Sequence, residues 1–270
     1  MSATVHCIAE SYAGPFPFAG LSKRQRQIVD RVRDQGFVTI ETLAEEFDTS
    51  AQTVRRDIIR LSEIGVLQRF HGGAGLADAS VKPARSARVD NTAAERQRVA
   101  EIVARQIAPG SSVFLDAGAT AQAVAIALRN HQGLRVVTCN LLAALSLGGV
   151  PAIAVQVTGG ELRGEDNALV GYQAITMLQD VRVDVAVIGC SGFDLDGAPM
   201  GFDGEKIAVK RAAMRRASRS ILAADASKFE RTAMMRIAAP ETFAMLVTSA
   251  PPGAAMAEAM AAAPLAVVVE

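Results

Sequence analysis

The stretch that follows Ser50 has hydrophobic residues at the spacing of an amphipathic helix. At 100° per residue, one side of this helix gathers three apolar side chains within about 60° of one another: Val54, Ile58 and Leu61. Ser50 can accept a hydrogen bond from the free N–H groups of the first turn. Gly65 suits the left-handed conformation that ends many helices. The pattern therefore predicts a capped helix with a buried stripe between these two residues.

Two further apolar repeats precede this helix. Residues 22–33 predict a helix that packs through Ile28, Val29 and Val32 and ends at Gly36. A shorter helix, capped by Thr39, is expected to bury Leu43 and Phe47. Three helices with a turn of about three or four residues before the last one describe a helix-turn-helix.

The outer face of the third helix carries side chains that can read DNA bases. Gln52 and Arg56 lie opposite the buried stripe, and Arg55 and Arg60 lie on its flanks. Arginine can bind guanine through two hydrogen bonds, and glutamine can bind adenine in the same way. A solvated helix face would also carry arginines, but the N-cap, the preceding helix and the basic turn that follows favour DNA binding.

A basic glycine turn follows the third helix. Arg69 and His71, beside Gly72 and Gly73, are expected to form a small wing that touches the phosphate backbone of DNA. The predicted DNA-binding residues are therefore Ser50, Gln52, Thr53, Arg55, Arg56, Arg60, Arg69 and His71.

The pattern changes after residue 76. A polar stretch with a proline predicts a linker, and a helix is expected from about residue 92 to 107. Short apolar runs then alternate with helical stretches, which predicts a mostly parallel α/β sheet; the runs are 112–116, 134–138, 153–158, 183–189, 220–225 and 244–248. The expected parts are a disordered extension (1–20), a winged helix-turn-helix domain (21–76), a linker (77–95) and an α/β effector domain (96–270).

Polar and glycine-bearing loops follow five of these predicted strands. Ligands of parallel sheets bind at the carboxyl ends of the strands, and the N–H groups of a small-residue loop that opens a helix can hold a phosphate. Each loop alone could be a tight turn, and each lysine a surface residue, but five such loops on one rim favour a site. The predicted effector-binding residues are Asp116, Gly118, Ala119, Thr120, Asn140, Gly160, Arg163, Gly189, Ser191, Gly192, Asp194, Lys210 and Lys228.

Several motifs resemble one known family. The run Gln-Thr-Val-Arg-Arg-Asp-Ile (52–58), followed by Leu-x-x-x-Gly-x-Leu-x-Arg-x-His-Gly-Gly-Ala (61–74), resembles the signature of the DeoR family of bacterial transcriptional regulators. The second half is similar to the effector domain of that family at Asp-x-Gly-x-Thr (116–120), Gly-Gly-x-Leu-Arg (159–163), Gly-x-Ser-Gly-x-Asp (189–194) and Asp-x-Ser-Lys-Phe (225–229). The resemblance runs from about Leu21 almost to the end. It implies a winged helix-turn-helix and a sugar-phosphate isomerase-like domain that binds a phosphorylated sugar or polyol.

The chain departs from this family pattern at three positions. Ala119 removes one hydroxyl from a phosphate loop that usually reads Gly-Thr-Thr, Cys139 stands where relatives often have asparagine, and Ser249 replaces a usual aspartate. Within the family, three runs favour glycerol 3-phosphate as the effector: 198–203, 228–234 and 248–252.

Charge and composition limit the mode of binding. The chain has 28 basic and 28 acidic residues, and residues 21–75 carry nine Lys or Arg against eight Asp or Glu. Attraction to DNA must therefore come from local clustering of charge. A modest affinity per subunit favours a homo-oligomer, a dimer or a tetramer. The low aromatic content and the absence of tryptophan disfavour a stacking surface for single strands.

Other sites and locations are disfavoured. Three cysteines without paired spacing argue against a disulfide framework or a metal site and fit a reducing cytoplasm. No long apolar run or signal segment predicts contact with a membrane. No cofactor is expected.

Two other functions can be weighed against regulation. A sugar-phosphate isomerase-like enzyme would fit the implied fold and the acidic Asp194 and Asp196, but residues 200–204 lack the lysine-glycine run of the isomerases. An RNA-binding protein is disfavoured because nothing in the N-terminal half resembles an RNA-recognition sheet. The sequence therefore predicts a non-enzymatic, sequence-specific regulator that binds double-stranded operator DNA. We expect it to repress a sugar or glycerol catabolic operon until a phosphorylated sugar or polyol binds.

Overall fold

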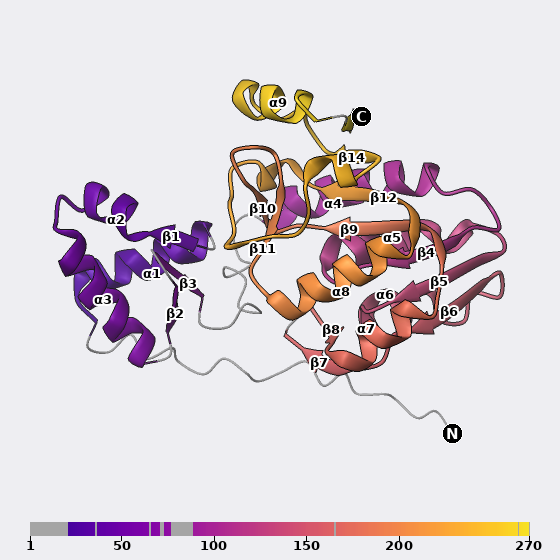
Figure 1. Cartoon of the computed structure of the whole chain (residues 1–270), viewed down its shortest axis with the longest axis horizontal. Helices are drawn as coiled ribbons and strands as arrows, with labels where there is room; N and C mark the ends of the chain where they lie inside the picture. Colours follow the sequence, from indigo (N-terminus) through magenta and orange to yellow (C-terminus); the bar gives the residue numbers. More distant parts are fainter. Residues whose placement is uncertain are drawn as a thin grey trace.

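The computed structural model describes residues 21–35, 37–64, 66–70, 73–76, 89–164, 166–263 and 265–269. The predicted extension at 1–20 lies outside the described residues, as do Gly36, Gly65, His71 and the predicted linker up to residue 88. Figure 1 shows an N-terminal unit in indigo and a larger α/β unit coloured from magenta to yellow.

The N-terminal unit is a winged helix-turn-helix. Its elements are α1 (Lys23–Gln35), β1 (Phe37–Thr39), α2 (Ile40–Glu46), α3 (Ala51–Glu63), β2 (Leu67–Phe70) and β3 (Gly73–Leu76). The three strands form an antiparallel sheet in the order β1-β3-β2. The apolar stripes of the three helices meet in one core, which includes Ile28, Leu43 and Ile58. The predicted fold of this unit is confirmed.

The α/β unit is built on seven strands: β4 (Ser112–Leu115), β5 (Leu134–Thr138), β6 (Ile153–Val157), β9 (Val183–Gly189), β12 (Ala217–Ala224), β14 (Met245–Thr248) and β15 (Ala266–Val269). Their order is β15-β14-β12-β9-β4-β5-β6, and every neighbouring pair is parallel. The first strand, β4, has β5 on one side and β9 on the other. The chain therefore builds the sheet outward in both directions from β4, which places the topological switch point between β4 and β9.

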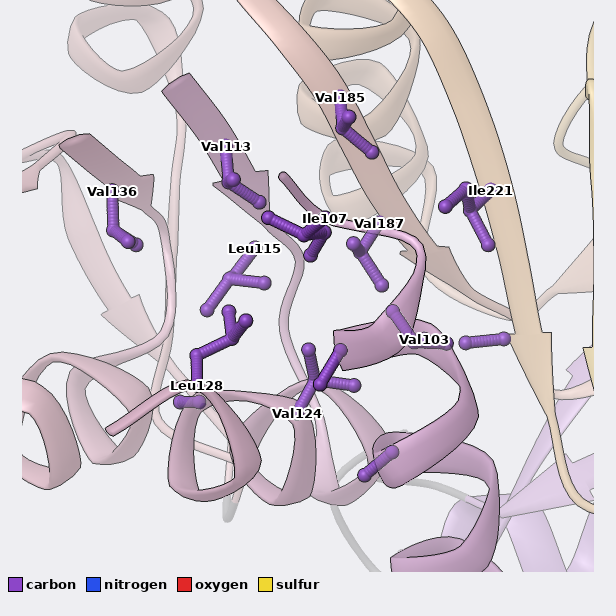
Figure 2. Packing of buried hydrophobic residues seen from close by; sticks show 14 of the residues in the cluster. Val103, Ile107, Val113, Leu115, Val124, Leu128, Val136, Val185, Val187 and Ile221 are labelled. Atoms are coloured by element: carbon purple, nitrogen blue, oxygen red, sulfur yellow. The ribbon is translucent and has the colours of Figure 1, made fainter. Parts of the chain in front are cut away.

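Helices cover both faces of this sheet because its strands alternate apolar side chains between them. In β9, Val185 and Val187 face a core formed with α4 (Val89–Arg105), α5 (Ala119–Ala127) and α6 (Leu141–Leu147). Figure 2 shows Val103, Val124 and Leu128 of the helical layer packed toward Val113 and Val187 of the strands. Ala186 and Ile188 face a second core with α7 (Tyr172–Gln179), α8 (Gly204–Arg215) and α9 (Ala254–Ala261).

Smaller elements lie within the loops that follow the strands. The hairpin β7 (Glu161–Arg163) and β8 (Ala168–Val170) follows β6, and a three-stranded sheet joins β10 (Gly192–Phe193), β11 (Pro199–Gly201) and β13 (Met235–Arg236). The 3₁₀ turn η2 (Ala226–Lys228) follows β12. One boundary differs from the prediction: α4 begins at Val89, so residues 89–95 are helical rather than linker.

Candidate functional sites

Helix α3 presents four predicted DNA-reading side chains to solvent. Gln52, Arg55, Arg56 and Arg60 are exposed, whereas the apolar stripe of the same helix is fully buried. Amphipathicity therefore orients the helix: burial of the stripe leaves the guanidinium groups free to donate to base edges or phosphates. The arrangement suits insertion of α3 into a major groove.

The start of α3 has the predicted cap. Ser50 Oγ accepts a hydrogen bond from the Thr53 N–H at 3.2 Å, and the two hydroxyl oxygens lie 2.9 Å apart. Both hydroxyls thus stabilise the first turn, and their contact with DNA stays a prediction. Arg69 lies in β2, the strand that leads into the predicted wing turn.

A buried carboxylate lies at the switch point of the parallel sheet. Asp116 directly follows β4, and its Oδ2 accepts the N–H of Gly189, the last residue of β9, at 2.9 Å. The Lys210 ammonium on α8 donates to the same oxygen, and it donates to the Gly189 carbonyl oxygen at 3.1 Å. Asp116 and Lys210 are both buried. The pair therefore ties two strand ends to α8, and contact of Lys210 with an effector stays a prediction.

Helix α5 begins beside this pair. Its N-cap, Gly118, has a φ of 100°, which favours glycine, and no side chain caps the helix. The first-turn N–H groups, including those of Ala119 and Thr120, therefore have no side-chain acceptor within the described chain. Unpaired N–H groups at the positive end of a helix suit an anion.

Asn140 fixes the loop that leads into α5. Its Nδ2 donates to the Gly118 carbonyl oxygen at 3.0 Å, and its Oδ1 accepts the N–H groups of Leu142 and Ala143 at the start of α6. Both ends of the amide are occupied by backbone groups. Asn140 therefore positions the loop and caps a helix, and direct contact with a ligand stays a prediction.

Lys228 is the cation best placed for an anionic ligand. Its side chain is half-buried at the end of η2, and burial lowers the pKa of its ammonium, partly offset by the Asp225 carboxylate. Across the described ranges, no hydrogen bond or ion pair is found for its Nζ. Cys190 lies within electrostatic reach of Lys228, Lys210 and Asp116. Asp116, Cys190 and Lys228 follow β4, β9 and β12, which are neighbouring strands, so these groups lie along one edge of the sheet.

The Cys190 thiol is half-buried beside these charged groups. Burial raises the pKa of Cys190 to about 12, although the Lys228 and Lys210 ammonium groups oppose the shift. Burial also raises the pKa of Cys139, which follows β5, and the Asp116 carboxylate adds to that shift. Both thiols are therefore neutral at physiological pH, where they add apolar lining and no nucleophile.

Two charged residues of the predicted site have partners elsewhere. Arg163, in β7, pairs with Glu205 at 2.9 Å, at the start of α8. Asp194 pairs with Arg236 at 3.2 Å, in the small three-stranded sheet. Both ion pairs are partly exposed. Neither residue has a contact with the Asp116–Lys210 pair among the described interactions.

Three small residues of the predicted site have structural explanations. A Cβ atom at Gly160 would collide with the Val170 carbonyl oxygen, and one at Gly192 would collide with that of Arg231. The Ser191 N–H donates to the Met200 carbonyl oxygen at 2.8 Å and so joins β11 to the loop after β9. Close packing therefore accounts for both glycines without a ligand.

The sequence analysis missed two groups near the site. Lys206, one turn before Lys210, pairs with Asp166 at 2.7 Å, which holds the β7–β8 hairpin against α8. Glu95, on α4, accepts a hydrogen bond from Ser249 Oγ at 3.4 Å. The same Ser249 Oγ accepts the Ala226 N–H at 2.9 Å. The i, i+4 spacing of the two lysines could have revealed the first group. The second could not be foreseen, because it joins segments that are 154 residues apart.

Comparison with known protein families identifies the family of each unit. Residues 24–80 match the family described as the DeoR-like helix-turn-helix domain, and residues 91–250 match the DeoR C terminal sensor domain. The chain belongs to the DeoR family of transcriptional regulators.

Individual relatives of this DeoR-family chain agree. It is 38% identical over 231 residues to the glycerol-3-phosphate regulon repressor of Escherichia coli (strain K12), covering 86% of this chain and 92% of the relative. It is 36% identical to the HTH-type transcriptional repressor CsqR of the same organism, covering 86% and 89%. Among solved structures, it is similar to ribose 5-phosphate isomerase A from Methanocaldococcus jannaschii, with 15% identity, coverage of 50% and 53%, and a TM-score of 0.37.

These relatives define the class of function. The chain is a DeoR-family transcriptional repressor and not an enzyme, with a DNA-binding unit and a sensor domain for a small-molecule effector. None of the helices in the described ranges has the length and apolarity needed to cross a membrane.

Proposed function

We propose that this repressor is relieved by a phosphorylated sugar or polyol, with glycerol 3-phosphate favoured, and that it represses a sugar or glycerol catabolic operon as a homo-oligomer. Glycerol 3-phosphate is favoured because the relative that is 38% identical is named as the repressor of a glycerol-3-phosphate regulon. A dimer or tetramer is proposed because the N-terminal unit carries little net positive charge. Two recognition helices bound together would compensate for a modest affinity per subunit.

The single observation that carries the effector class is the unpaired Lys228 ammonium at the switch-point rim. Near the strand ends stand the uncapped N-terminus of α5 and two neutral thiols, the buried Cys139 and the half-buried Cys190. A phosphate dianion would supply the negative charge that both the ammonium and the helix N-terminus can bind, and partial burial strengthens its attraction to the ammonium. Hydroxyl groups of the effector would find donors and acceptors in the Asp116–Lys210 pair. Phosphate plus hydroxyls describes a sugar or polyol phosphate.

Helix α4 is the proposed route from the effector to the DNA-binding unit. It begins at Val89 and is the first helix after the N-terminal unit in the sequence. It packs against α5, whose N-terminus is part of the proposed site. Glu95 of α4 also bonds Ser249, which holds Ala226 at the start of the turn that carries Lys228. A ligand that moves Lys228 or α5 therefore acts directly on α4.

The free energy that couples effector binding to operator release can be estimated. A hundredfold loss of operator affinity requires about 2.7 kcal/mol of differential effector binding between the DNA-bound and released arrangements. A phosphate that gains an ammonium and several N–H groups in only one arrangement can supply this free energy.

A thermal-shift experiment tests the effector class. The full-length protein is heated with glycerol 3-phosphate, with glycerol, with inorganic phosphate and with a panel of sugar phosphates. A ligand at 100 times its dissociation constant adds about 2.7 kcal/mol of stability, which raises the midpoint by several degrees. We expect a rise with a phosphorylated compound and none with glycerol. If no phosphorylated compound shifts the midpoint, the proposed effector class is wrong and the DNA-binding function stands.

A further inference from the structure

A buried carboxylate joins the recognition helix to the first helix of the N-terminal unit. Asp57 lies on α3 between the exposed Arg56 and the buried Ile58. Its Oδ2 accepts Arg24 Nε at 2.6 Å, and its Oδ1 accepts Gln25 Nε2 at 3.0 Å. Asp57 is 7% exposed and Gln25 is 6% exposed. Both carboxylate oxygens are therefore held by α1, although 32 residues separate Gln25 from Asp57.

The donor on α1 is itself fixed. Gln25 Oε1 accepts the Ser22 N–H at 3.0 Å, while Ser22 Oγ accepts the Gln25 N–H at 3.2 Å. This reciprocal pair is a capping box at the start of α1. Because the oxygen end of the Gln25 amide is used by Ser22, its NH₂ end must face Asp57. The capping box thus turns the amide donor of Gln25 toward α3, where it adds to the donor of Arg24.

We propose that the network of Ser22, Arg24, Gln25 and Asp57 sets the rotation of α3 about its own axis and so positions its arginines for operator recognition. The apolar stripe of α3 sets which side of the helix is buried, but the hydrophobic effect is not directional, so the stripe fixes the rotation only coarsely. A rotation of about 20° displaces a group about 6 Å from a helix axis by about 2 Å. That displacement is enough to break a bidentate hydrogen bond to a base. Phosphate attraction, which acts over longer distances, would change little.

The network can be broken by single substitutions and rebuilt by a double substitution that keeps the wild-type net charge. In Asp57→Asn, the new NH₂ group meets the NH₂ of Gln25 or the guanidinium of Arg24, so one donor always faces another. In Gln25→Glu, two carboxylates meet. In the double variant Gln25→Glu/Asp57→Asn, the amide at position 57 donates to the carboxylate at position 25. The second carboxylate oxygen keeps the capping box with Ser22. The double variant therefore restores every donor–acceptor pair, with the carboxylate now at position 25 and Arg24 donating to the neutral amide oxygen at position 57.

The test compares two DNA duplexes. One is recovered by the full-length wild-type protein from a random-sequence pool, and the other is its scrambled counterpart. Affinities are measured by fluorescence anisotropy at a temperature where circular dichroism and native-state hydrogen exchange show α3 folded in each variant. Each single variant is expected to lose about tenfold or more in affinity for the selected duplex and less than about threefold for the scrambled one. The double variant should recover to within about threefold of wild type for the selected duplex.

Arg31→Gln is the matched control. It removes another cross-helix ion pair of α1, one made with Glu46 of α2 rather than with α3. Its ratio of selected to scrambled affinity should equal that of wild type. If the single variants keep the wild-type ratio while α3 is folded, or if the folded double variant fails to recover, the positioning role is wrong. A loss of both affinities in proportion to the unfolded fraction would also overturn it, since that result shows stabilisation alone.

Discussion

The Lys210 ammonium donates to the Asp116 carboxylate across 94 residues of sequence, and this pair joins α8 to the strand at which the sheet reverses. Asp116 also accepts the Gly189 N–H, so one oxygen holds the ends of β4 and β9 together. The effector site is proposed at this junction. Its stability and its response to a ligand therefore depend on the same few atoms.

Removal of the lysine should destabilise the sensor domain strongly. Lys210→Met leaves the buried Asp116 carboxylate without its cation, which costs about 3–5 kcal/mol. Denaturant unfolding followed by circular dichroism measures the loss. Arg236→Gln, which breaks the partly exposed pairs with Asp194 and Asp196, is the control and should cost far less stability. Equal losses for the two variants would contradict the importance of the buried pair.

Arg56 should contribute to base recognition. Arg56→Ala removes an exposed guanidinium from the outer face of α3 and should weaken binding to a selected operator by about 1–3 kcal/mol. It should also relax discrimination at one base pair, which a panel of single-base operator variants would reveal by anisotropy. Arg129→Ala, which removes an exposed arginine of the α/β unit, is the control. Discrimination that is unchanged at every base pair would exclude Arg56 from base recognition.

The cap of α3 should contribute measurably to its stability. Ser50→Ala removes the acceptor for the Thr53 N–H and should cost about 1 kcal/mol. Native-state hydrogen exchange of α3 amides reports this local loss. Ser62→Ala, near the other end of the helix, should leave protection unchanged. Equal protection in wild type and Ser50→Ala would show that water replaces the cap without cost.

Cys190 should react slowly at neutral pH. Burial raises its pKa to about 12, so the thiolate fraction continues to grow well above pH 9. Iodoacetamide labelling, followed by mass spectrometry of the Cys190 peptide, should accelerate by about tenfold per pH unit between pH 8 and pH 10. A free cysteine peptide should level off near the top of this range. Because the pKa is higher in the folded state, burial of the neutral thiol contributes its full share to the free energy of unfolding below about pH 9. This contribution is lost as the pH rises toward 12. A labelling rate that levels off near pH 8 would contradict this burial.

The fold was largely predictable because its signals are local. Val54, Ile58 and Leu61 repeat at the helical period, and the six apolar runs of the sheet are each bounded by glycine or polar residues. Asp116 and Gly189 were predicted as site residues from a local signal too, since each lies at the end of an apolar run. In contrast, β1 and the short strands β7, β8, β10, β11 and β13 are two or three residues long, too short to show a period. β15, a run of four apolar residues near the chain end, was also missed.

The roles of individual polar residues were less predictable because they depend on distant partners. Lys210 was predicted to bind the effector, and in the fold it donates to the Asp116 carboxylate and the Gly189 carbonyl oxygen. Arg163 and Asp194 carry the family motifs, yet each has an ion-pair partner that only the folded chain brings close. Sequence spacing indicates which side of an element a residue occupies. It does not indicate which donor or acceptor reaches that residue from another element.

The most direct test of the proposed mechanism is release of operator DNA by the effector in matched variants. Glycerol 3-phosphate is titrated into complexes of a selected operator duplex with wild type, Lys228→Gln and Arg129→Gln. Lys228 is the unpaired cation at the rim, and Arg129 lies at the opposite end of α5. All three proteins should bind the operator equally. Lys228→Gln should require at least about tenfold more effector for release, because it loses one charge-assisted hydrogen bond, while Arg129→Gln should match wild type. If Lys228→Gln responds as wild type does, the effector does not bind at this rim and the central claim is wrong.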